Sequence, residues 1–297
     1  MKLNKINTDM VRSKSVRIQL LALDVDGTLF NEEGKITPAS IAAIKKAQQA
    51  GITVVIASGR DYETIPWNQL EGIEIPYAIT LNGSSMFRTS DDKCLYEECI
   101  PTEQALAIVT HLLPQKMYME AFIDGKSYAP AELAAYVHEL TLPKHIIDMI
   151  VGKQLVMKDM PERIRQGAKV QKGTLNFIKL SDGTFLHREE TRRFLESMGC
   201  LSIVNGGYHN LEFTRAGVDK SVGLHKVAEL LDIPMEAVAA IGDSDNDIRM
   251  LEDAGLGIAM ENALDRVKCK ADAVTLSNEE DGVAFAIEKI LSVQNVV

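Results

Sequence analysis

The chain has 297 residues, of which 46% are hydrophobic and 25% charged, values typical of a soluble globular protein with one large or two ordinary domains. Its formal charge of −10 argues against general nucleic-acid binding, which needs a basic surface, and means that any phosphate site must supply its own positive charge. No apolar run approaches the ~20 residues that span a bilayer, so no membrane association is expected.

Residues 1–16 and the cysteines indicate the cellular compartment of the protein. Residues 1–16 are polar and lack the apolar core of a signal peptide, so they are predicted to form a flexible extension. The four cysteines include no C-x-x-C pair, and an acidic chain without a signal indicates reduced thiols and a cytoplasmic location. The six histidines include no H-x-x-x-H pair, so no zinc site is expected.

The first third of the chain alternates between strand and helix. Residues 17–23 (R-I-Q-L-L-A-L) form a short apolar run that predicts a buried strand. Thr37 suits the N-cap of a following helix, Pro38 its first turn and Gly51 its end. The apolar run Ile52–Ala57 predicts a second strand, and a strand, a helix and a strand in this order indicate a parallel crossover.

The middle of the chain shows no such regular alternation. Met86–Arg88 and Cys94–Glu97 flank a polar stretch and predict a hairpin. The other predicted elements here are the helices Glu103–Leu113, Glu132–Leu140 and Glu189–Met198 and the strands Tyr118–Ile123 and Leu175–Leu180. We therefore expect residues 86–212 to form a separate α+β domain that is inserted into the sheet domain.

The last third returns to alternating strands and helices. Its predicted elements are the helix Asp219–Leu231, the strand Ala237–Ile241, the helix Asn246–Asp253, the strands Leu256–Met260 and Ala273–Leu276, and the helix Val283–Leu291. Residues 17–85 and 213–297 are thus predicted to form one discontinuous domain of class α/β. Its sheet would be doubly wound, mostly parallel and Rossmann-like, with helices on both faces.

Asp24 and Asp26 stand where the first predicted strand ends. In open α/β sheets this edge forms the crevice in which ligands bind. Two carboxylates separated by one residue repel each other unless a cation neutralises them. Taken alone, this pair is as typical of a solvated turn as of a functional site.

A second acidic cluster, G-D-S-D-N-D at 242–247, directly follows another predicted strand. Its three acids match the first three ligand positions of a calcium loop. However, Ile248 stands at the required glycine and Ala254 at the final glutamate. A helix N-cap would account for one of these acids and not for three. The cluster therefore favours a different kind of metal site.

Three other positions offer donors for an anion. Residues 58–60 (S-G-R) end the second predicted strand, where a hydroxyl, a flexible backbone and a guanidinium can bind phosphate oxygens. Lys220 lies in the first turn of a predicted helix, where the helix dipole disfavours a cation, and this placement favours a nearby anion. Asn82 and Gly83 form a further polar strand exit.

With these motifs the chain resembles the haloacid dehalogenase-like hydrolase superfamily, and within it the Cof-type sugar-phosphatase group, over nearly all of residues 18–290. The four superfamily motifs are matched by D-V-D-G-T at 24–28, A-S-G-R at 57–60, G-V-D-K at 217–220 and G-D-S-D-N-D at 242–247. A-M-E-N-A at 259–263 and S-N-E-E-D-G-V-A at 277–284 are also similar to this group. The large insert resembles the cap domain that closes over the crevice in this group.

The resemblance implies a role for each matching residue. Asp24 would be the nucleophile that forms an aspartyl-phosphate, and Asp26 would protonate the leaving oxygen and then deprotonate the attacking water. Mg²⁺ would bind Asp24, the backbone carbonyl of Asp26 and Asp243, with Asp247 in support. The phosphate-binding residues would be Thr28, Ser58, Gly59, Lys220 and Asn246. Further contacts to the substrate would come from Arg60, Asn82 and Gly83.

Two details test this assignment. Asp26 can act as an acid near neutral pH only if nearby negative charge and burial hold a proton on it. A second D-G-T, at 182–184, lacks an acid two positions earlier and is predicted to be a simple turn.

The predicted function is Mg²⁺-dependent hydrolysis of a small phosphorylated metabolite, such as a sugar phosphate. One alternative is a phosphomutase or other phosphotransferase on the same scaffold. A second is a non-enzymatic phosphate- or metal-binding module, which would need Asp24 far more than Asp26. The oligomeric state, monomer or homodimer, stays open.

Overall fold

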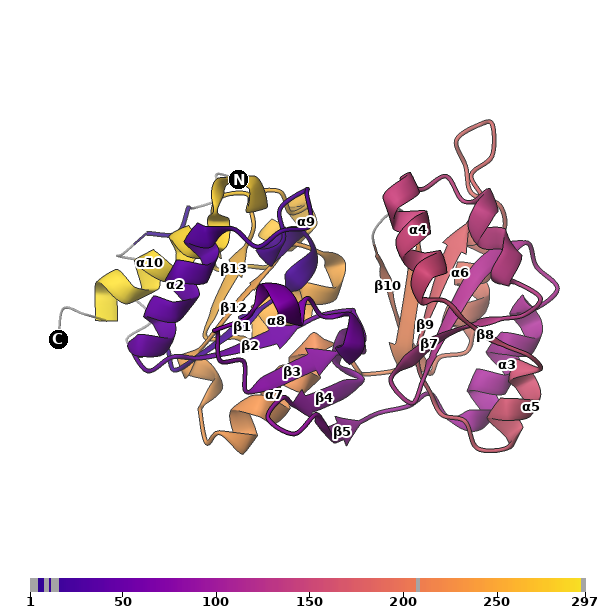
Figure 1. Ribbon diagram of the computed structural model, residues 1–297, viewed down its shortest axis with the longest axis horizontal. Helices are drawn as coiled ribbons and strands as arrows, with labels where there is room; N and C mark the ends of the chain where they lie inside the picture. The colour runs from indigo at the N-terminus through magenta and orange to yellow at the C-terminus, as the bar shows by residue number, and fades with distance from the viewer. Residues whose placement is uncertain (1–4, 8–10, 12–15, 207–208, 295–297) are drawn as a thin grey trace. The chain divides into compact units, whose positions relative to one another are not determined.

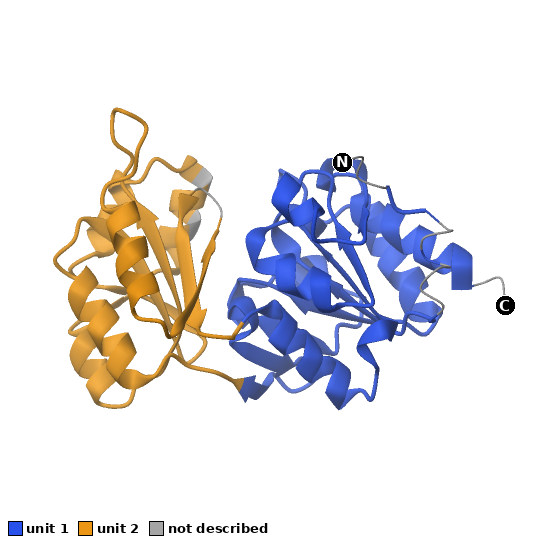
Figure 2. Ribbon diagram, turned by 180° about the vertical axis from the view of Figure 1, so that it is seen from behind, with its two compact units in different colours: residues 1–96, 219–297 blue, residues 97–218 orange. Residues whose placement is uncertain are grey.

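The computed structural model describes residues 5–7, 11, 16–206 and 209–294. The chain divides into two compact units, which Figure 2 shows in different colours. Unit 1 comprises Met1–Tyr96 and Asp219–Val297, and unit 2 comprises Glu97–Val218. Both joins fall later in the chain than the limits expected from the sequence, which were 85/86 and 212/213.

Unit 1 is built on an eight-stranded sheet with the strand order β14-β13-β12-β1-β2-β3-β4-β5. The strands are β1 Leu20–Leu23, β2 Thr53–Ala57, β3 Tyr77–Thr80, β4 Ser85–Arg88, β5 Lys93–Glu97, β12 Val238–Gly242, β13 Leu256–Ala259 and β14 Ala273–Val274. All neighbours from β14 to β3 are parallel, and β4 runs antiparallel to β3. The predicted α/β class with a mostly parallel sheet is confirmed.

Helices cover both faces of this sheet (Figure 1). They are α2 Pro38–Gln49, α7 Lys220–Leu230, α8 Ile248–Asp253, α9 Asp265–Lys268 and α10 Gly282–Gln294. Ile44 of α2 and Ile287 of α10 share an apolar cluster with Ile56 of β2. The next residue back in β2, Val55, belongs to a second cluster with Leu224 of α7. Alternate residues of the strand thus point into two cores, as a parallel sheet buried on both faces requires.

Unit 2 is an α+β domain on a six-stranded sheet with the order β10-β11-β9-β6-β7-β8. The strands are β6 Met117–Ile123, β7 Lys126–Pro130, β8 Leu155–Met157, β9 Val170–Phe177, β10 Leu201–Asn205 and β11 Leu211–Arg215. The helices are α3 Thr102–Leu112, α4 Lys144–Lys153, α5 Met160–Arg165 and α6 Arg188–Ser197. Leu112, Ile164 and Leu195 from three of these helices share one apolar cluster with Met119 and Leu175 of the sheet.

In the middle of the chain, the structure departs from three expectations. The hairpin at 86–97 belongs to the sheet of unit 1, where β4 and β5 are the last two strands, and not to the insert. Residues 132–140 contain the short 3-10 helix η5 Ala134–Glu139 rather than an α-helix. The strand expected at 175–180 lies earlier, at Val170–Phe177.

The described part of residues 1–16 packs against unit 1. Lys5 forms a parallel bridge with Val274, and the backbone N–H of Ile6 donates to the Val274 carbonyl at 2.8 Å. Ile6 and Val11 are buried in the core. The expectation of a flexible extension is therefore wrong for these residues, while 1–4, 8–10 and 12–15 lie outside the described residues.

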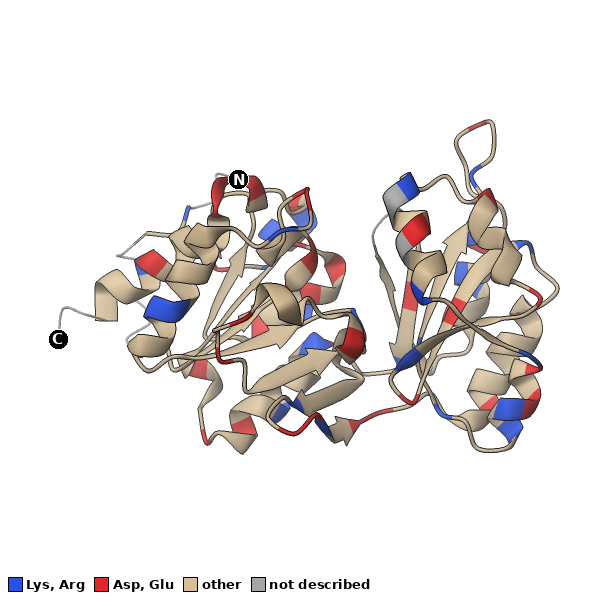
Figure 3. Ribbon diagram, viewed as in Figure 1, with Lys and Arg blue, Asp and Glu red and all other residues tan. Residues whose placement is uncertain are grey.

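Charged residues of both signs are interspersed along the elements of both units (Figure 3). Positive charge at a phosphate site must therefore come from individual side chains, as the net charge of −10 already required. Within the described part of the chain, no helix has the length and apolar character needed to cross a membrane.

Candidate active site

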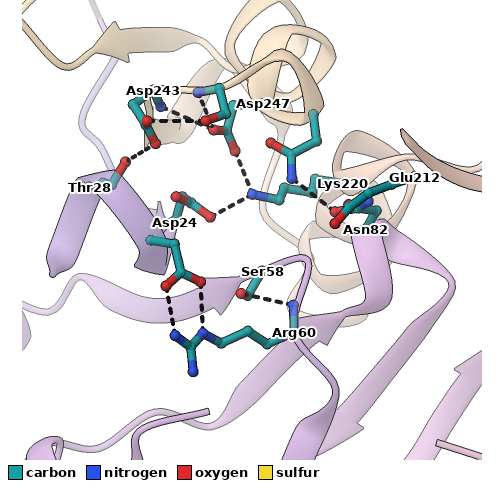
Figure 4. Close-up of polar contacts among 12 residues, drawn as sticks. Asp24, Thr28, Ser58, Arg60, Asn82, Glu212, Lys220, Asp243 and Asp247 are labelled. Carbon is teal, nitrogen blue, oxygen red and sulfur yellow. Dashed lines mark hydrogen bonds and ion pairs between the residues drawn. The ribbon is translucent and has the colours of Figure 1, made fainter. Parts of the chain in front are cut away.

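Four neighbouring strands of unit 1 bring the predicted site residues to one edge of the sheet. β12, β1, β2 and β3 are parallel neighbours, so their carboxyl ends share an edge. Asp24 follows β1, Ser58 follows β2 and Asp243 follows β12. Asn82 lies in the turn Leu81–Gly83 (η4) after β3. Figure 4 shows how these residues, far apart in the sequence, converge.

The turn that follows β1, Val25–Leu29 (η1), touches the loop that follows β12. Gly27 adopts a φ of +80°, and a Cβ atom at this position would lie 2.5 Å from Asp243 Oδ2. Glycine is therefore required here both for its backbone conformation and for the close approach. The hydroxyl of Thr28 donates to Asp243 Oδ1 at 3.1 Å, so this threonine contacts the second acidic motif.

Three carboxylates and one ammonium form the centre of the site. Asp24, Asp243 and Asp247 each offer an oxygen, and these oxygens all lie within 4.8 Å of one another. The ammonium of Lys220 bonds to Asp24 Oδ1 at 2.6 Å and to Asp247 Oδ1 at 2.7 Å. Lys220 and Asp247 are fully buried, and Asp24 is 4% exposed. The structure thus groups the predicted nucleophile, two predicted metal ligands and the predicted cation.

Local structure fixes Lys220 and Asp247 in place. Lys220 is the first residue of α7, and the side chain of the N-cap residue Asp219 accepts a hydrogen bond from the backbone of Val222 at 3.2 Å. The Asp247 Oδ2 atom accepts hydrogen bonds from the backbone N–H groups of Asp243 and Ser244, at 3.0 and 2.9 Å. Asp247 therefore organises the acidic loop with one oxygen and binds Lys220 with the other.

Burial and mutual repulsion change the acidities of these groups. Burial raises the pKa of Asp24 well above its usual value, against the lowering effect of Lys220, and Asp247 and Asp243 raise it further. Burial, together with Asp247, also raises the pKa of Asp243 to about 6. For Lys220, burial works against the charge, but Asp24 and Asp247 outweigh it and raise the pKa. The group carries more negative charge than one ammonium balances, which favours a bound cation.

Asp26 points to a different partner. Its two carboxylate oxygens each accept a hydrogen bond from Arg60, both at 2.7 Å, and its side chain is 56% exposed. The expected burial of this acid is therefore not observed. Arg60 also donates to the Thr64 carbonyl at 2.9 Å and lies over the ring of Phe30 at 5.3 Å. Arg60 thus holds Asp26, a contact that its assignment to the substrate did not anticipate.

The remaining predicted binding residues lie around this centre. Ser58 is buried, its hydroxyl accepts from the backbone N–H of Arg60 at 3.2 Å, and Gly59 lies between the two in the same turn. Asn246 donates to Asn82 Oδ1 at 2.9 Å, which joins the turn after β3 to the acidic loop. The second D-G-T forms a local turn in unit 2, where the backbone of Thr184 donates to Asp182 Oδ1 at 2.9 Å.

Two asparagines that touch this site received no role from the sequence. Asn262 donates to the Gly27 carbonyl at 2.8 Å, and Asn278 donates to the Phe30 carbonyl at 2.8 Å. Both belong to the motifs at 259–263 and 277–284. Those motifs were a signal for the site, but they do not indicate which residue after β1 each asparagine contacts.

The model of the haloacid dehalogenase-like hydrolase family matches residues 21–287, and the chain therefore belongs to this family. The family membership predicted from the motifs is confirmed. A HAD subclass IIB sugar phosphatase of known structure shares the fold, with a TM-score of 0.74 at 24% identity over 91% of this chain and 98% of that one. The inserted α+β domain is accordingly a cap domain, as the resemblance implied.

Individual relatives define the class of activity. The chain is 33% identical over 294 residues to the 5-amino-6-(5-phospho-D-ribitylamino)uracil phosphatase YwtE of Bacillus subtilis, over 93% of this chain and 99% of that protein. It is 29% identical over 272 residues to the pyridoxal phosphate phosphatase YbhA of Escherichia coli, with coverages of 90% and 96%. A haloacid dehalogenase-like hydrolase from B. subtilis superimposes with a TM-score of 0.78 at 28% identity, with coverages of 91% and 99%. The chain is a haloacid dehalogenase-like phosphatase.

Proposed function

We propose that the protein is a Mg²⁺-dependent phosphatase of small phosphorylated metabolites and that it transfers the phosphoryl group to Asp24. The observation that carries this proposal is the buried bond between Lys220 and Asp24 inside a group of three carboxylates. A carboxylate that approaches a phosphate dianion meets a repulsion of ~4 kcal/mol per pair of unit charges at about 4 Å, with an effective dielectric constant near 20. A fixed ammonium and a divalent cation offset this repulsion.

The residues present fit a magnesium ion. Asp24, Asp243 and Asp247 provide closely spaced carboxylate oxygens, which are the ligands that Mg²⁺ prefers. By the family resemblance, the backbone carbonyl of Asp26 would add a fourth ligand. When bound, the ion would supply positive charge that neutralises Asp24 and the phosphoryl oxygens.

In the first half of the proposed reaction, an oxygen of Asp24 attacks the phosphorus atom and the bond from phosphorus to the leaving oxygen breaks. Asp26 gives its proton to that oxygen, so the product leaves as an alcohol. Lys220 holds the attacking carboxylate, while Ser58 and the backbone of Gly59 bind the phosphoryl oxygens. Asp26 must turn away from Arg60 and take up a proton before it can act as the acid, because Arg60 occupies both oxygens of its carboxylate.

In the second half, Asp26 removes a proton from a water molecule, and that water attacks the phosphorus of the aspartyl-phosphate. The bond to Asp24 breaks, inorganic phosphate forms and Asp24 returns as a carboxylate. Asp26 ends with a proton, ready for the next cycle. The same side chain thus serves as acid and then as base, which requires a residue near the phosphoryl group that can reorient.

The proposed substrates are phosphate monoesters of small metabolites, such as sugar phosphates. The names of the two relatives support this class, because the phosphorylated ribitylaminouracil and pyridoxal phosphate are both small phosphate monoesters. The identities of 33% and 29% support the class of substrate and not a single compound. The cap domain would select among these esters.

The test is phosphate release from a panel of phosphorylated metabolites, with Mg²⁺ and then with a chelator. We expect turnover of at least one member of the panel and its loss on chelation. Turnover that survives chelation would contradict the metal-dependent mechanism. An isomerised phosphate ester without free phosphate would indicate a phosphomutase, and binding without any turnover would indicate a binding module.

A further inference from the structure

Two asparagines that follow neighbouring strands donate hydrogen bonds to the segment after β1 that carries the proposed catalytic acids. Asn262 follows β13 and donates to the Gly27 carbonyl at 2.8 Å. Asn278 follows β14 and donates to the Phe30 carbonyl at 2.8 Å. The two are joined to each other, since the backbone N–H of Asn278 donates to Asn262 Oδ1 at 3.0 Å. We call this linked pair the asparagine clasp.

The partners of Asn262 fix the orientation of its amide. Its Nδ2 atom faces a carbonyl, which can only accept, and its Oδ1 atom faces a backbone N–H, which can only donate. Rotating the amide by 180° would place its Nδ2 donor against the N–H of Asn278 and its Oδ1 acceptor against the Gly27 carbonyl. Asn262 therefore joins the loop after β14 to the turn after β1 in one arrangement.

The asparagine clasp binds the turn at Gly27, where both the backbone conformation and a close neighbour restrict movement. Gly27 has a φ of +80° and faces Asp243 on one side, where a Cβ atom would lie 2.5 Å from the carboxylate. Its carbonyl is bound by Asn262. Gly27 also separates Asp26 from Thr28, the residue whose hydroxyl binds Asp243. A shift of the Gly27 peptide would therefore move Asp26 and the contact to Asp243 together.

We propose that Asn262 and Asn278 are positioning residues for phosphoryl transfer, which hold the turn Val25–Leu29 so that Asp24, Asp26 and Asp243 keep their mutual geometry. This inference rests on the proposed function for its kinetic consequence. Asn262 is exposed, so its replacement leaves no buried cavity and removes little beyond these hydrogen bonds. A small misplacement of reacting groups can nevertheless cost on the order of 100-fold in rate.

The kinetic test compares Asn262→Ala, Asn262→Asp, Asn278→Ala and the double alanine variant. Asn262→Asp keeps an acceptor for Asn278 and loses the donor to Gly27. We expect kcat to fall about ten- to a hundredfold in each single variant, with KM within about twofold of wild type. The double variant should lose little more than either single variant, because the two residues act as one unit. Additive losses, or a rise in KM with unchanged kcat, would overturn the proposal.

Asn31→Ala is the matched control. The Asn31 side chain accepts from the backbone of Lys35 at 2.8 Å in the loop just after the turn Val25–Leu29. Within the described part of the chain, this side chain forms no hydrogen bond or ion pair with residues 24–29. Its removal costs a comparable exposed hydrogen bond, so we expect a similar change in melting temperature with unchanged kcat. A kcat loss in this control equal to that of Asn262→Ala would show that the effect is general to the loop and would overturn the proposal.

A second measurement does not depend on turnover. Amide hydrogen exchange, followed by mass spectrometry, reports on the order of residues 24–30 in the full-length, metal-free protein. We expect faster exchange in this segment in Asn262→Ala and Asn278→Ala, and unchanged exchange in Asn31→Ala. Unchanged exchange in the two clasp variants would overturn the inference, even if the protein hydrolyses phosphate esters. Absence of turnover in the wild type would instead contradict the proposed function, and the exchange data would still decide the clasp.

Discussion

Asp24 and Asp26 stand two residues apart and lie in different electrostatic environments. Asp24 is buried against Lys220 and two further carboxylates, while Asp26 is half exposed and held by Arg60. Neither residue has helical backbone angles, since Asp24 has φ −71° and ψ 163° and Asp26 has φ −81° and ψ 119°. The different environments of the two carboxylates are what the proposed division of roles requires.

The first prediction concerns this division of roles. Asp24→Asn removes the proposed nucleophile, and we expect phosphate release to fall by more than about 10⁴-fold. Asp26→Asn removes proton transfer and should cost about 10²–10⁴-fold. Asp182→Asn changes the same D-G-T sequence at an exposed turn in unit 2 and should leave turnover unchanged. Steady-state kinetics with Mg²⁺ check this, and an active Asp24→Asn would contradict the mechanism.

The second prediction concerns the stability of the metal-free protein. The pKa of Asp243 rises from 3.8 to about 6 on folding. Between these values the native state binds more protons than the unfolded state, so this group's contribution to stability falls as the pH rises through that window. Above pH 6 the Asp243 carboxylate is ionised in both states, and its full unfavourable contribution to the free energy of unfolding remains. We expect metal-free Asp243→Asn to be more stable than wild type at pH 7 by about 1–3 kcal/mol, with the gain fading toward pH 4.

Urea unfolding between pH 4 and pH 8 measures this difference directly. The three carboxylates of the proposed Mg²⁺ site come together only in the folded state. Added Mg²⁺ should therefore stabilise the wild type, and it should stabilise Asp243→Asn much less. A variant that is less stable than wild type at pH 7 without metal would show that Asp243 is a net stabilising group.

At the scale of single elements, the position of Lys220 depends on how α7 meets the turn after β3. Gly83 in that turn has a φ of +90°, and a Cβ there would lie 1.9 Å from the Asp219 carbonyl oxygen and 3.1 Å from the Lys220 backbone nitrogen. No side chain fits between this turn and the start of the helix. Gly83 was expected to contact the substrate. Its lack of a side chain is also what allows α7 to begin here and place Lys220 in the site.

The third prediction follows from this close approach. Gly83→Ala should push the start of α7 away, lower stability by about 2–4 kcal/mol and reduce kcat through displacement of Lys220. Gly34→Ala is the control, since Gly34 has a φ of +70° and its Cβ would meet no atom within 4 Å. That variant should cost about 1 kcal/mol of backbone strain and leave kcat unchanged. Denaturant unfolding and kinetics check both variants, and equal effects would contradict the argument.

The elements of unit 1 could be predicted from the sequence because their signals are local and strong. Runs such as Ile52–Ala57 are apolar throughout, and Thr37 caps α2 as expected, with its side chain accepting from the backbone of Ser40 at 3.1 Å. Unit 2 was harder. The elements α4, α5, β7, β8, β10 and β11 were not predicted, because they are short or mix polar with apolar residues. The pairing of β4 with β3 also depends on contacts that no local pattern encodes.

The residues of the site could also be predicted from the sequence in part. Acids and donors at strand ends indicated which residues meet, because parallel strands place their carboxyl ends at one edge. The pair of Asp26 with Arg60 was not indicated, since it depends on side-chain directions at two different strand ends. The asparagine clasp was missed for a related reason. Its members bind backbone carbonyls, which leave no mark in the sequence of the partner.

At the scale of the whole molecule, the two units differ in the number of chain segments that form them. Unit 2 is one continuous segment, Glu97–Val218, with its own apolar cluster, while unit 1 needs two separate segments. A continuous segment with its own core can fold alone.

The fourth prediction tests this difference. The fragment 97–218 should fold by itself and unfold cooperatively in urea, as followed by circular dichroism. The fragment 1–96 lacks β12, β13 and β14 and should remain unfolded, because β1 would lose its parallel neighbour β12. A folded fragment 1–96, or a fragment 97–218 without a cooperative transition, would contradict this account of the units.

The discontinuity of unit 1 also bears on synthesis. The ribosome makes Asp24 early, but its partner Lys220 lies 196 residues later and Asp247 later still. Asp24, the proposed nucleophile, is therefore without its ammonium partner while the entire cap domain is translated. A chain that stops anywhere within the cap domain contains Asp24 but lacks Lys220 and the second acidic loop. If the proposed mechanism holds, we expect chains that terminate within the cap domain to be inactive and activity to arise only after the last third of the chain has been made.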